Sequence, residues 1–206
     1  MGLKLILRLK NFVFLGFLVF IAFFIQSTHY PQGIPLQNLP KNLKSQFQVG
    51  DFVFRKGLDS DSVLIAYLSH SYFSHIGMIV STQPLTIIHA TTNDKPQHKN
   101  QVILSSLEEF LSQSRTFGVK RLKVNPKIRA EIAKKAQSYL GQPFILKSDS
   151  TSLYCTTFLE ESIKAYLDFE VPYMQINFPI LGGKYLFPQS FWEHSLMQTI
   201  LDVFPH

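Results

Sequence analysis

The chain has 206 residues, enough for one domain of ordinary size and an additional segment. Its net charge of +6 does not indicate a nucleic-acid-binding protein, because three of the cations lie in the first ten residues and the others form no basic stripe interleaved with aromatic residues. The single cysteine, Cys155, excludes an intrachain disulfide, so this thiol has either a packing role or a chemical one.

The N-terminal segment, residues 1–26, has the composition of a membrane anchor or a secretory signal. Lys4, Arg8 and Lys10 precede an uncharged run rich in Phe, Leu, Val and Ile over residues 12–25. Crossing a bilayer takes about 20 apolar residues and a signal takes about 7 to 15, but the sequence after this run lacks the small residues that signal peptidase prefers. We therefore expect an uncleaved anchor rather than a cleaved signal or a buried core helix.

The basic residues before the apolar run place the N-terminus of such an anchor in the cytoplasm. The rest of the chain would then lie in the periplasm, on the outer side of a bacterial inner membrane, or would be secreted if the segment is cleaved. Residues 27–46 contain three prolines among polar residues, which predicts an extended linker. The folded domain is expected over residues 47–206, which is long enough for a single core.

Hydrophobic patterning predicts a mixture of strands and helices along this domain. Strands are expected at 52–54, 76–80, 85–90 and 117–124, and helices at 60–69, 107–111, 126–140 and from residue 155 onward. Residues 91–100 are polar and predict a loop. Residues 171–206 mix proline with aromatic residues, and we expect them to form loops that wall a groove.

Cys155 lies where a helical pattern begins. The residues that share its face are Phe158, Leu159, Ser162, Ile163 and Tyr166. Backbone amides at a helix N-terminus carry partial positive charge, which favours a thiolate and lowers the pKa of a cysteine placed there. The pattern therefore predicts a nucleophilic thiol that faces the interior of the domain.

Two histidines lie on the pair of strands expected at 76–80 and 85–90. A hairpin loop over residues 81–85 pairs Ile79 with Ile87 and Gly77 with His89. A slip of this register by one residue would send His89 to the opposite face of the sheet.

In the predicted register, His89 lies diagonally from His75 on the same face. Diagonal neighbours are about 7 to 8 Å apart at the backbone, and Gly77 leaves space for the two imidazoles to meet. Cys155, His75 and His89 then correspond to the nucleophile, the base and the orienting polar residue of a thiol hydrolase.

Other interpretations of these residues are open. Cys155, His75 and His89 could supply three zinc ligands, although the short-spaced ligand pairs usual in zinc sites are absent. A histidine at a strand start is also often a packed or surface residue, and we assign no role to His70 or His98. No cofactor is expected.

Five short motifs follow one another along nearly the whole expected domain. They are Gly50-Asp51-Phe52-Val53-Phe54, Ser74-His75-Ile76-Gly77-Met78, Ile88-His89-Ala90, Tyr139-Leu140-Gly141-Gln142-Pro143-Phe144 and Tyr154-Cys155-Thr156. In this order they resemble the circularly permuted NlpC-type papain-like enzymes, specifically the YiiX/YebB-like group. The histidine precedes the cysteine, which reverses the order in papain, and lecithin:retinol acyltransferase-like proteins share this permuted order.

This resemblance implies an α+β fold in which an antiparallel sheet packs against the cysteine-bearing helix. It implies thiol attack on an amide or ester with an acyl-enzyme intermediate, with Cys155 as nucleophile, His75 as base and His89 as the third polar residue. Phe144 stands where relatives often have Tyr, and Thr156 where Ser is common. A phenolic hydroxyl at residue 144 is thus unavailable to an oxyanion hole, and the backbone amide of Cys155 is a candidate donor.

Three functions are compatible with these features. The first is a periplasmic amidase or peptidase that acts on peptides, including cell-wall peptide cross-bridges. The second is a lipid-directed acyl hydrolase or acyltransferase, which the aromatic C-terminal walls and the membrane segment favour. The third is a non-catalytic binding module, which predicts that Cys155→Ala preserves function and that iodoacetamide labels Cys155 no faster than an ordinary thiol. None of the three involves nucleic acid, and the sequence leaves the oligomeric state open.

Overall fold

The structure is a computed structural model that describes residues 33–35, 39, 42–59, 62, 65–67, 69–92, 94, 95, 97–177 and 182–204. The predicted membrane anchor, residues 1–26, lies outside these ranges. Within them, no helix is both long and apolar enough to cross a bilayer. Contacts divide the chain at Pro31, and the unit that begins at Gln32 contains all the described residues.

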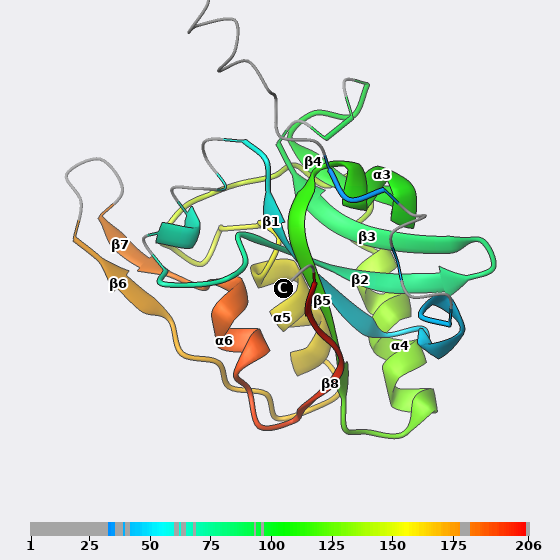
Figure 1. Cartoon of the computed structure of the whole chain (residues 1–206). Coiled ribbons are helices and arrows are strands. Elements are labelled where there is room, and N and C mark those ends of the chain that lie inside the picture. The colour runs from blue at the N-terminus through cyan, green and yellow to red at the C-terminus, as the bar shows by residue number, and fades with distance from the viewer. Residues whose placement is uncertain are drawn as a thin grey trace, which may run out of the picture. The chain divides into compact units, whose positions relative to one another are not determined.

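A six-stranded sheet forms the centre of this unit (Figure 1). Its strands are β1 (Asp51–Gly57), β2 (His75–Thr82), β3 (Leu85–Thr91), β4 (Gln101–Ser106), β5 (Ser114–Leu122) and β8 (Met197–Phe204). They lie in the order β4-β3-β2-β1-β5-β8, and each neighbouring pair is antiparallel. The expectation of an α+β fold with a large antiparallel sheet is therefore confirmed.

The remaining elements are short. They are η2 (Lys44–Gln46), α3 (Leu107–Ser112), α4 (Pro126–Gln137), α5 (Thr157–Lys164), α6 (Pro188–Trp192) and a small separate sheet of β6 (Met174–Ile176) and β7 (Gly183–Tyr185). Helix α3 begins with a capping box, in which the Ser106 hydroxyl accepts from the Glu109 N–H and the Glu109 carboxylate accepts from the Ser106 N–H. The Asn125 side chain caps α4, which has proline at its start.

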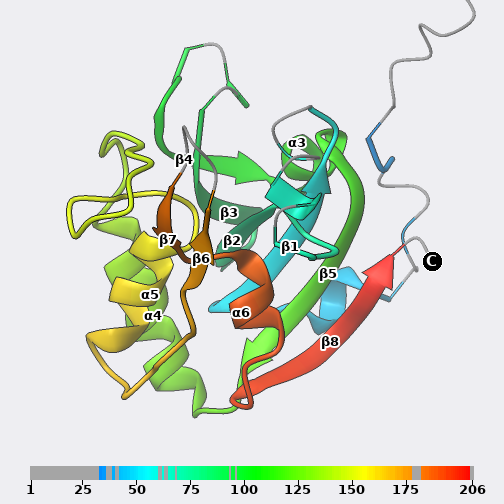
Figure 2. The ribbon, with the colours of Figure 1, turned by 90° about the vertical axis from the view of Figure 1, so that its left-hand side faces the viewer.

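Residues on the two faces of the sheet enter two different core clusters, as period-2 alternation requires. Phe52, Phe54, Ile76 and Met78 pack with the apolar residues of α4 and α5, which Figure 2 shows side by side. Their neighbours along the strands pack with α3 instead, a cluster that includes Val53, Ile79, Ile87, Phe110 and Leu111.

The Gly50-Asp51 motif joins β1 to β5. Asp51 is fully buried, and its two carboxylate oxygens accept from Arg121 Nε at 2.6 Å and from Arg121 Nη2 at 2.8 Å. Gly50 has φ +86°, and a Cβ there would lie 2.7 Å from Arg129 Cβ, so the turn requires glycine. This motif therefore has a structural role, far along the strands from the histidines.

The structure differs from the sequence predictions in several segments. Strand β4 was not expected, and β6, β7, α6 and β8 lie in the region expected to form only loops. Strand β8 pairs with β5, and its apolar residues Ile200, Leu201, Val203 and Phe204 pack partly buried against the cores in adjacent pairs, so its sequence carries no clear alternation. Part of the predicted linker also packs on the domain, because Ile34, Leu39 and Leu43 are buried in the α3-side core.

Candidate active site

The β2–β3 hairpin sets the positions of the two histidines. Ile79 pairs with Ile87 as the sequence predicted, and Met78 pairs with Ile88. The loop is tighter than expected, since Thr82 already pairs with Leu85, and an irregularity between residues 79 and 81 restores the register.

His75 and His89 meet in the interior. Nε2 of His75 lies 2.9 Å from Nδ1 of His89, which is a hydrogen bond between the two rings. A Cβ at Gly77 would approach His89 Cβ to 3.2 Å, so glycine leaves the room that this contact needs, as predicted. On its other side, His89 Nε2 lies 3.0 Å from the Ser105 hydroxyl of β4. The Phe110 ring packs on both imidazoles, with centroid distances of 5.8 Å and 5.2 Å.

Cys155 lies in the turn that leads into α5, two residues before the helix begins. Two buried threonines fix this turn. The Thr156 hydroxyl donates to the Leu186 carbonyl at 2.8 Å, and the Thr157 hydroxyl accepts from the Tyr154 N–H at 2.9 Å. Cys155 belongs to the core cluster on the α5 side of the sheet, so its predicted inward orientation is confirmed.

The predicted stripe along α5 ends earlier than expected. Its members up to Ile163 are buried, but Tyr166 lies beyond the end of the helix and is 44% exposed.

The thiol of Cys155 does not have the lowered pKa that its sequence position predicted. Burial raises the pKa of this thiol to about 11. The backbone N–H of Ile76, the Arg55 charge and the backbone N–H groups of Thr156 and Cys155 act in the opposite direction, but burial outweighs them. Cys155 is therefore a protonated thiol at neutral pH in the free protein.

Both histidines are neutral. Burial, followed by the charge of Arg55 and the proximity of His89, lowers the pKa of His75 well below its usual range, and Asp94 opposes this shift. Burial lowers the pKa of His89 to about 3, against the raising effect of Asp94. A neutral imidazole at His75 can accept a proton, because it has an unprotonated nitrogen.

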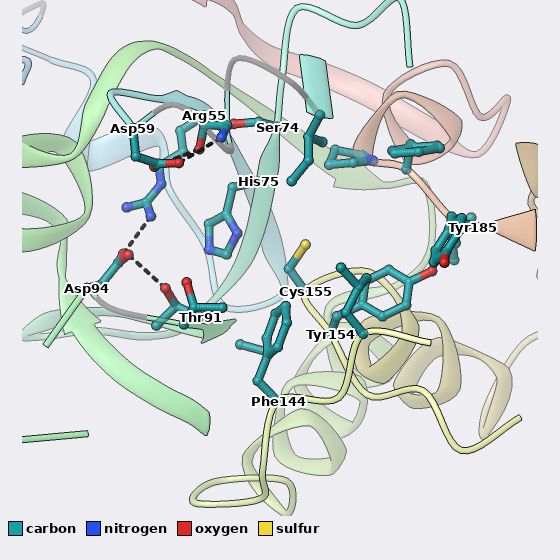
Figure 3. A pocket seen from close by; sticks show the side chains of 18 of the residues that line it. Arg55, Asp59, Ser74, His75, Thr91, Asp94, Phe144, Tyr154, Cys155 and Tyr185 are labelled. Carbon is teal, nitrogen blue, oxygen red and sulfur yellow. Dashed lines mark hydrogen bonds and ion pairs between the residues drawn. The ribbon is translucent and has the colours of Figure 1, made fainter. Parts of the chain in front are cut away.

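A pocket of about 350 Å³ contains both Cys155 and His75 in its wall (Figure 3). Since His75 Nε2 faces His89, Nδ1 is the nitrogen of His75 left to serve the pocket. No hydrogen bond joins this Nδ1 to another side chain in the described part of the chain. His89 is fully buried behind His75, so the structure brings all three predicted site residues into one region.

The sequence analysis missed a buried ion pair beside the histidines. Arg55 lies opposite His75 in the pairing of β1 with β2, and its Nη2 lies 2.5 Å from Asp94 Oδ2. The Thr91 hydroxyl donates to the other Asp94 oxygen at 2.7 Å, and the Asp94 carboxylate lies 3.9 Å from His89 Nδ1. A signal was present, because Arg55 directly continues the apolar run Phe52-Val53-Phe54 of β1.

The other sequence alternatives find little support in the geometry. His70 and His98 are exposed and lie outside the pocket. Among the described residues, no three His, Cys, Asp or Glu side chains are placed to hold a metal ion together.

Comparison with known proteins decides the family. Residues 46–201 match the model of the permuted papain-like amidase family YaeF/YiiX, C92. The chain belongs to this family. The YiiX-like resemblance predicted from the five motifs is thereby confirmed.

One solved structure similar to this chain is described as the metalloprotein YiiX from Escherichia coli O157:H7. It is 19% identical in sequence, with a TM-score of 0.62, and the match covers 75% of this chain and 96% of that one. This likeness establishes a shared fold. A search of curated proteins found no match.

Proposed function

We propose that the chain is a cysteine amidase in which Cys155 is the nucleophile, His75 the general base and acid, and His89 the residue that orients His75. One observation carries the proposal: His75 and Cys155 line the same pocket, and the hydrogen bond to His89 engages Nε2 of His75, which leaves Nδ1 as the candidate proton acceptor. Membership of an amidase family supports the choice of an amide bond. The substrate classes considered are peptides, cell-wall peptides and lipid amides.

The proposed reaction begins with a protonated Cys155 thiol and a neutral His75 imidazole. As Sγ of Cys155 attacks the amide carbon, the thiol proton passes to Nδ1 of His75. The backbone amide of Cys155 is a candidate donor to the oxygen that becomes negative. His75 then gives the proton to the departing nitrogen, and the C–N bond breaks to leave a thioester on Cys155.

Water completes the cycle. His75 takes a proton from a water molecule as its oxygen attacks the thioester carbon, and the C–S bond breaks to release the acid. His75 returns that proton to the sulfur. Throughout, Nε2–H of His75 donates to Nδ1 of His89, provided that His89 carries its own proton on Nε2, toward Ser105.

The raised pKa of Cys155 affects what thiol labelling can show. Because burial holds the Cys155 pKa near 11, iodoacetamide should label the thiol slowly, and more quickly as the pH rises toward 11. An amidase and a non-catalytic module would therefore both be labelled slowly. Measured hydrolysis of a substrate distinguishes the two.

The experiment compares the wild-type chain with Cys155→Ala, Cys155→Ser and His75→Ala on a panel of peptide amides, purified muropeptides and N-acyl amides. We expect hydrolysis by the wild type and a loss of at least a hundredfold in each variant. Trapping of an acyl group on Cys155, detected by mass spectrometry, would support the thioester. Equal hydrolysis by wild type and Cys155→Ala would refute the proposal.

We further propose that residues 1–26 tether the catalytic domain to a membrane, with the domain on the periplasmic side. The support is the uncharged apolar run over residues 12–25 after three basic residues. Alkaline carbonate should leave the full chain in the membrane fraction and extract a Leu18→Lys variant. Full extraction of the wild type would contradict the tether.

A further inference from the structure

The charged residues and the apolar residues that line the pocket lie on different sides of it. Its charged residues are Arg55, Asp59 and Asp94, which come from β1, the segment after β1 and the loop after β3. Thr91, the last residue of β3, and Thr92, which follows it, also line the pocket. Figure 3 shows Asp59, Arg55, Asp94 and Thr91 on one side of His75.

Among the described residues, the opposite part of the wall carries no charge. Apart from Cys155, the described residues of segments 144–155 and 176–188 that line the pocket are apolar or aromatic, among them Phe144, Leu146, Tyr154, Ile176, Tyr185 and Phe187. Figure 3 shows Tyr154 and Tyr185 beyond Cys155, on the side away from the ion pair. The Tyr154 hydroxyl is occupied, since it accepts from the Leu186 N–H at 2.8 Å.

The chemistry of amide cleavage sets which end of a substrate lies on the charged side of the pocket and which on the apolar side. The leaving nitrogen must lie next to His75, which supplies its proton, and the acyl carbon must lie on Sγ of Cys155. The leaving group therefore lies on the His75 side, toward Arg55, Asp94 and Thr91. The acyl group extends past Cys155 toward the apolar wall.

We infer that the substrate is an amide with an apolar acyl group and a polar leaving group, and that Leu146 is a specificity-determining residue for the acyl group. This inference rests on the proposed amidase function and narrows its substrate class. A pocket of about 350 Å³ has room for roughly a dozen groups the size of a water molecule, so the acyl group is of medium length. The polar acyl groups of cell-wall peptides would leave their hydrogen-bonding groups unpaired against the apolar wall.

Leu146 offers a matched pair of variants. Leu146 lines the pocket and is 47% exposed, whereas Leu140 is 50% exposed and does not line it. Leu146→Asp places a charge in the apolar part of the wall, and Leu140→Asp places the same charge on an equally exposed leucine elsewhere. Both positions are exposed, and substitutions at exposed positions seldom affect folding strongly.

The first measurement does not depend on turnover. The full chain is labelled with N-alkyl iodoacetamides of increasing chain length, and the rate of Cys155 alkylation is followed by mass spectrometry. Each added methylene that becomes fully buried should raise the rate by up to about fourfold until the pocket is full. Wild type and Leu140→Asp should show this dependence, and Leu146→Asp should lose most of it.

The second measurement uses amides that share one polar leaving group and carry acyl chains from acetyl to dodecanoyl. We expect kcat/KM to rise with chain length in wild type and Leu140→Asp, and to stay flat in Leu146→Asp. Rates that do not depend on chain length in the wild type, or equal effects of the two aspartates, would overturn the inference. Cys155-dependent hydrolysis of short or polar amides alone would overturn it while leaving the proposed amidase function intact.

Discussion

Removing the negative charge of Asp94 should weaken both the fold and the reaction. Arg55 is 5% exposed at its side chain and Asp94 is 17% exposed, so Asp94→Asn would leave a buried guanidinium without its counterion. Loss of one partner from a fully buried pair costs about 3–5 kcal/mol, and the partial exposure of Asp94 reduces this to about 2–4 kcal/mol.

The pH of the measurement follows from the sign of the pKa shift. Arg55, followed by the two histidines and the Thr91 hydroxyl, holds the pKa of Asp94 well below its usual range, against the effect of burial. A depressed carboxyl pKa stabilises the folded state above about pH 3.9, and this stabilisation is lost as the pH falls through the folded pKa. The full effect is therefore present at pH 7, where urea unfolding of the variants should be compared.

Asp149→Asn is a close control. Asp149 also accepts a threonine hydroxyl hydrogen bond, from Thr151 at 2.6 Å, but it is exposed and has no arginine partner. We expect its urea midpoint to match that of the wild type. In the double variant Arg55→Met/Asp94→Asn, most of the stability lost in Asp94→Asn should return, because no unpaired charge remains.

The same variants test the electrostatics of the proposed base. Arg55 lowers the pKa of His75 and Asp94 raises it, so Asp94→Asn should make His75 a weaker base and reduce kcat by about tenfold or more, with the acidic limb of the pH profile moved to lower pH. The double variant should recover much of this activity. If Asp94→Asn behaves like Asp149→Asn in both stability and pH profile, the reasoning is wrong.

Three further substitutions probe the site. Gly77→Ala places a Cβ 2.6 Å from Ile87 Cγ2, so we expect about 1–3 kcal/mol of destabilisation by urea unfolding and lower kcat from a disturbed histidine pair. His89 is neutral when buried and titrates near pH 6.5 when unfolded, so the free energy of unfolding should fall by about 1.4 kcal/mol per pH unit as the pH drops from about 6 to 4. His89→Gln should make this slope shallower by about that amount. An unchanged slope would contradict the argument that burial keeps His89 neutral. Tyr154→Phe leaves the Leu186 N–H unpaired, which should cost about 1–3 kcal/mol in the same assay, and no loss would mean that water replaces the hydroxyl.

The register of the β2–β3 hairpin shows how much of the site local sequence can predict. Side chains alternate along a strand, so the spacing of Ile79 and Ile87 was enough to place His89 on the same face as His75, with Gly77 leaving room between them. The bulge in the hairpin could not be foreseen, because a tight turn and an extra residue compensate each other. Strand β8 escaped prediction because its apolar residues come in adjacent pairs, 200–201 and 203–204, and its pairing with β5 is irregular, so no period-2 alternation marks it.

Three features follow from the amino-acid sequence alone: the order of the motifs, the inward direction of Cys155 and the pairing of the two histidines. They depend on local periodicity and on neighbours along one hairpin. The charge state of the site depends instead on contacts between distant parts of the chain. The pKa of Cys155 is raised rather than lowered because chain segments distant in sequence bury the sulfur, and the effect of burial exceeds that of nearby N–H groups. The Arg55–Asp94 pair and the apolar wall beyond Cys155 likewise exist only because β1, the loop after β3 and the C-terminal segments meet at one pocket.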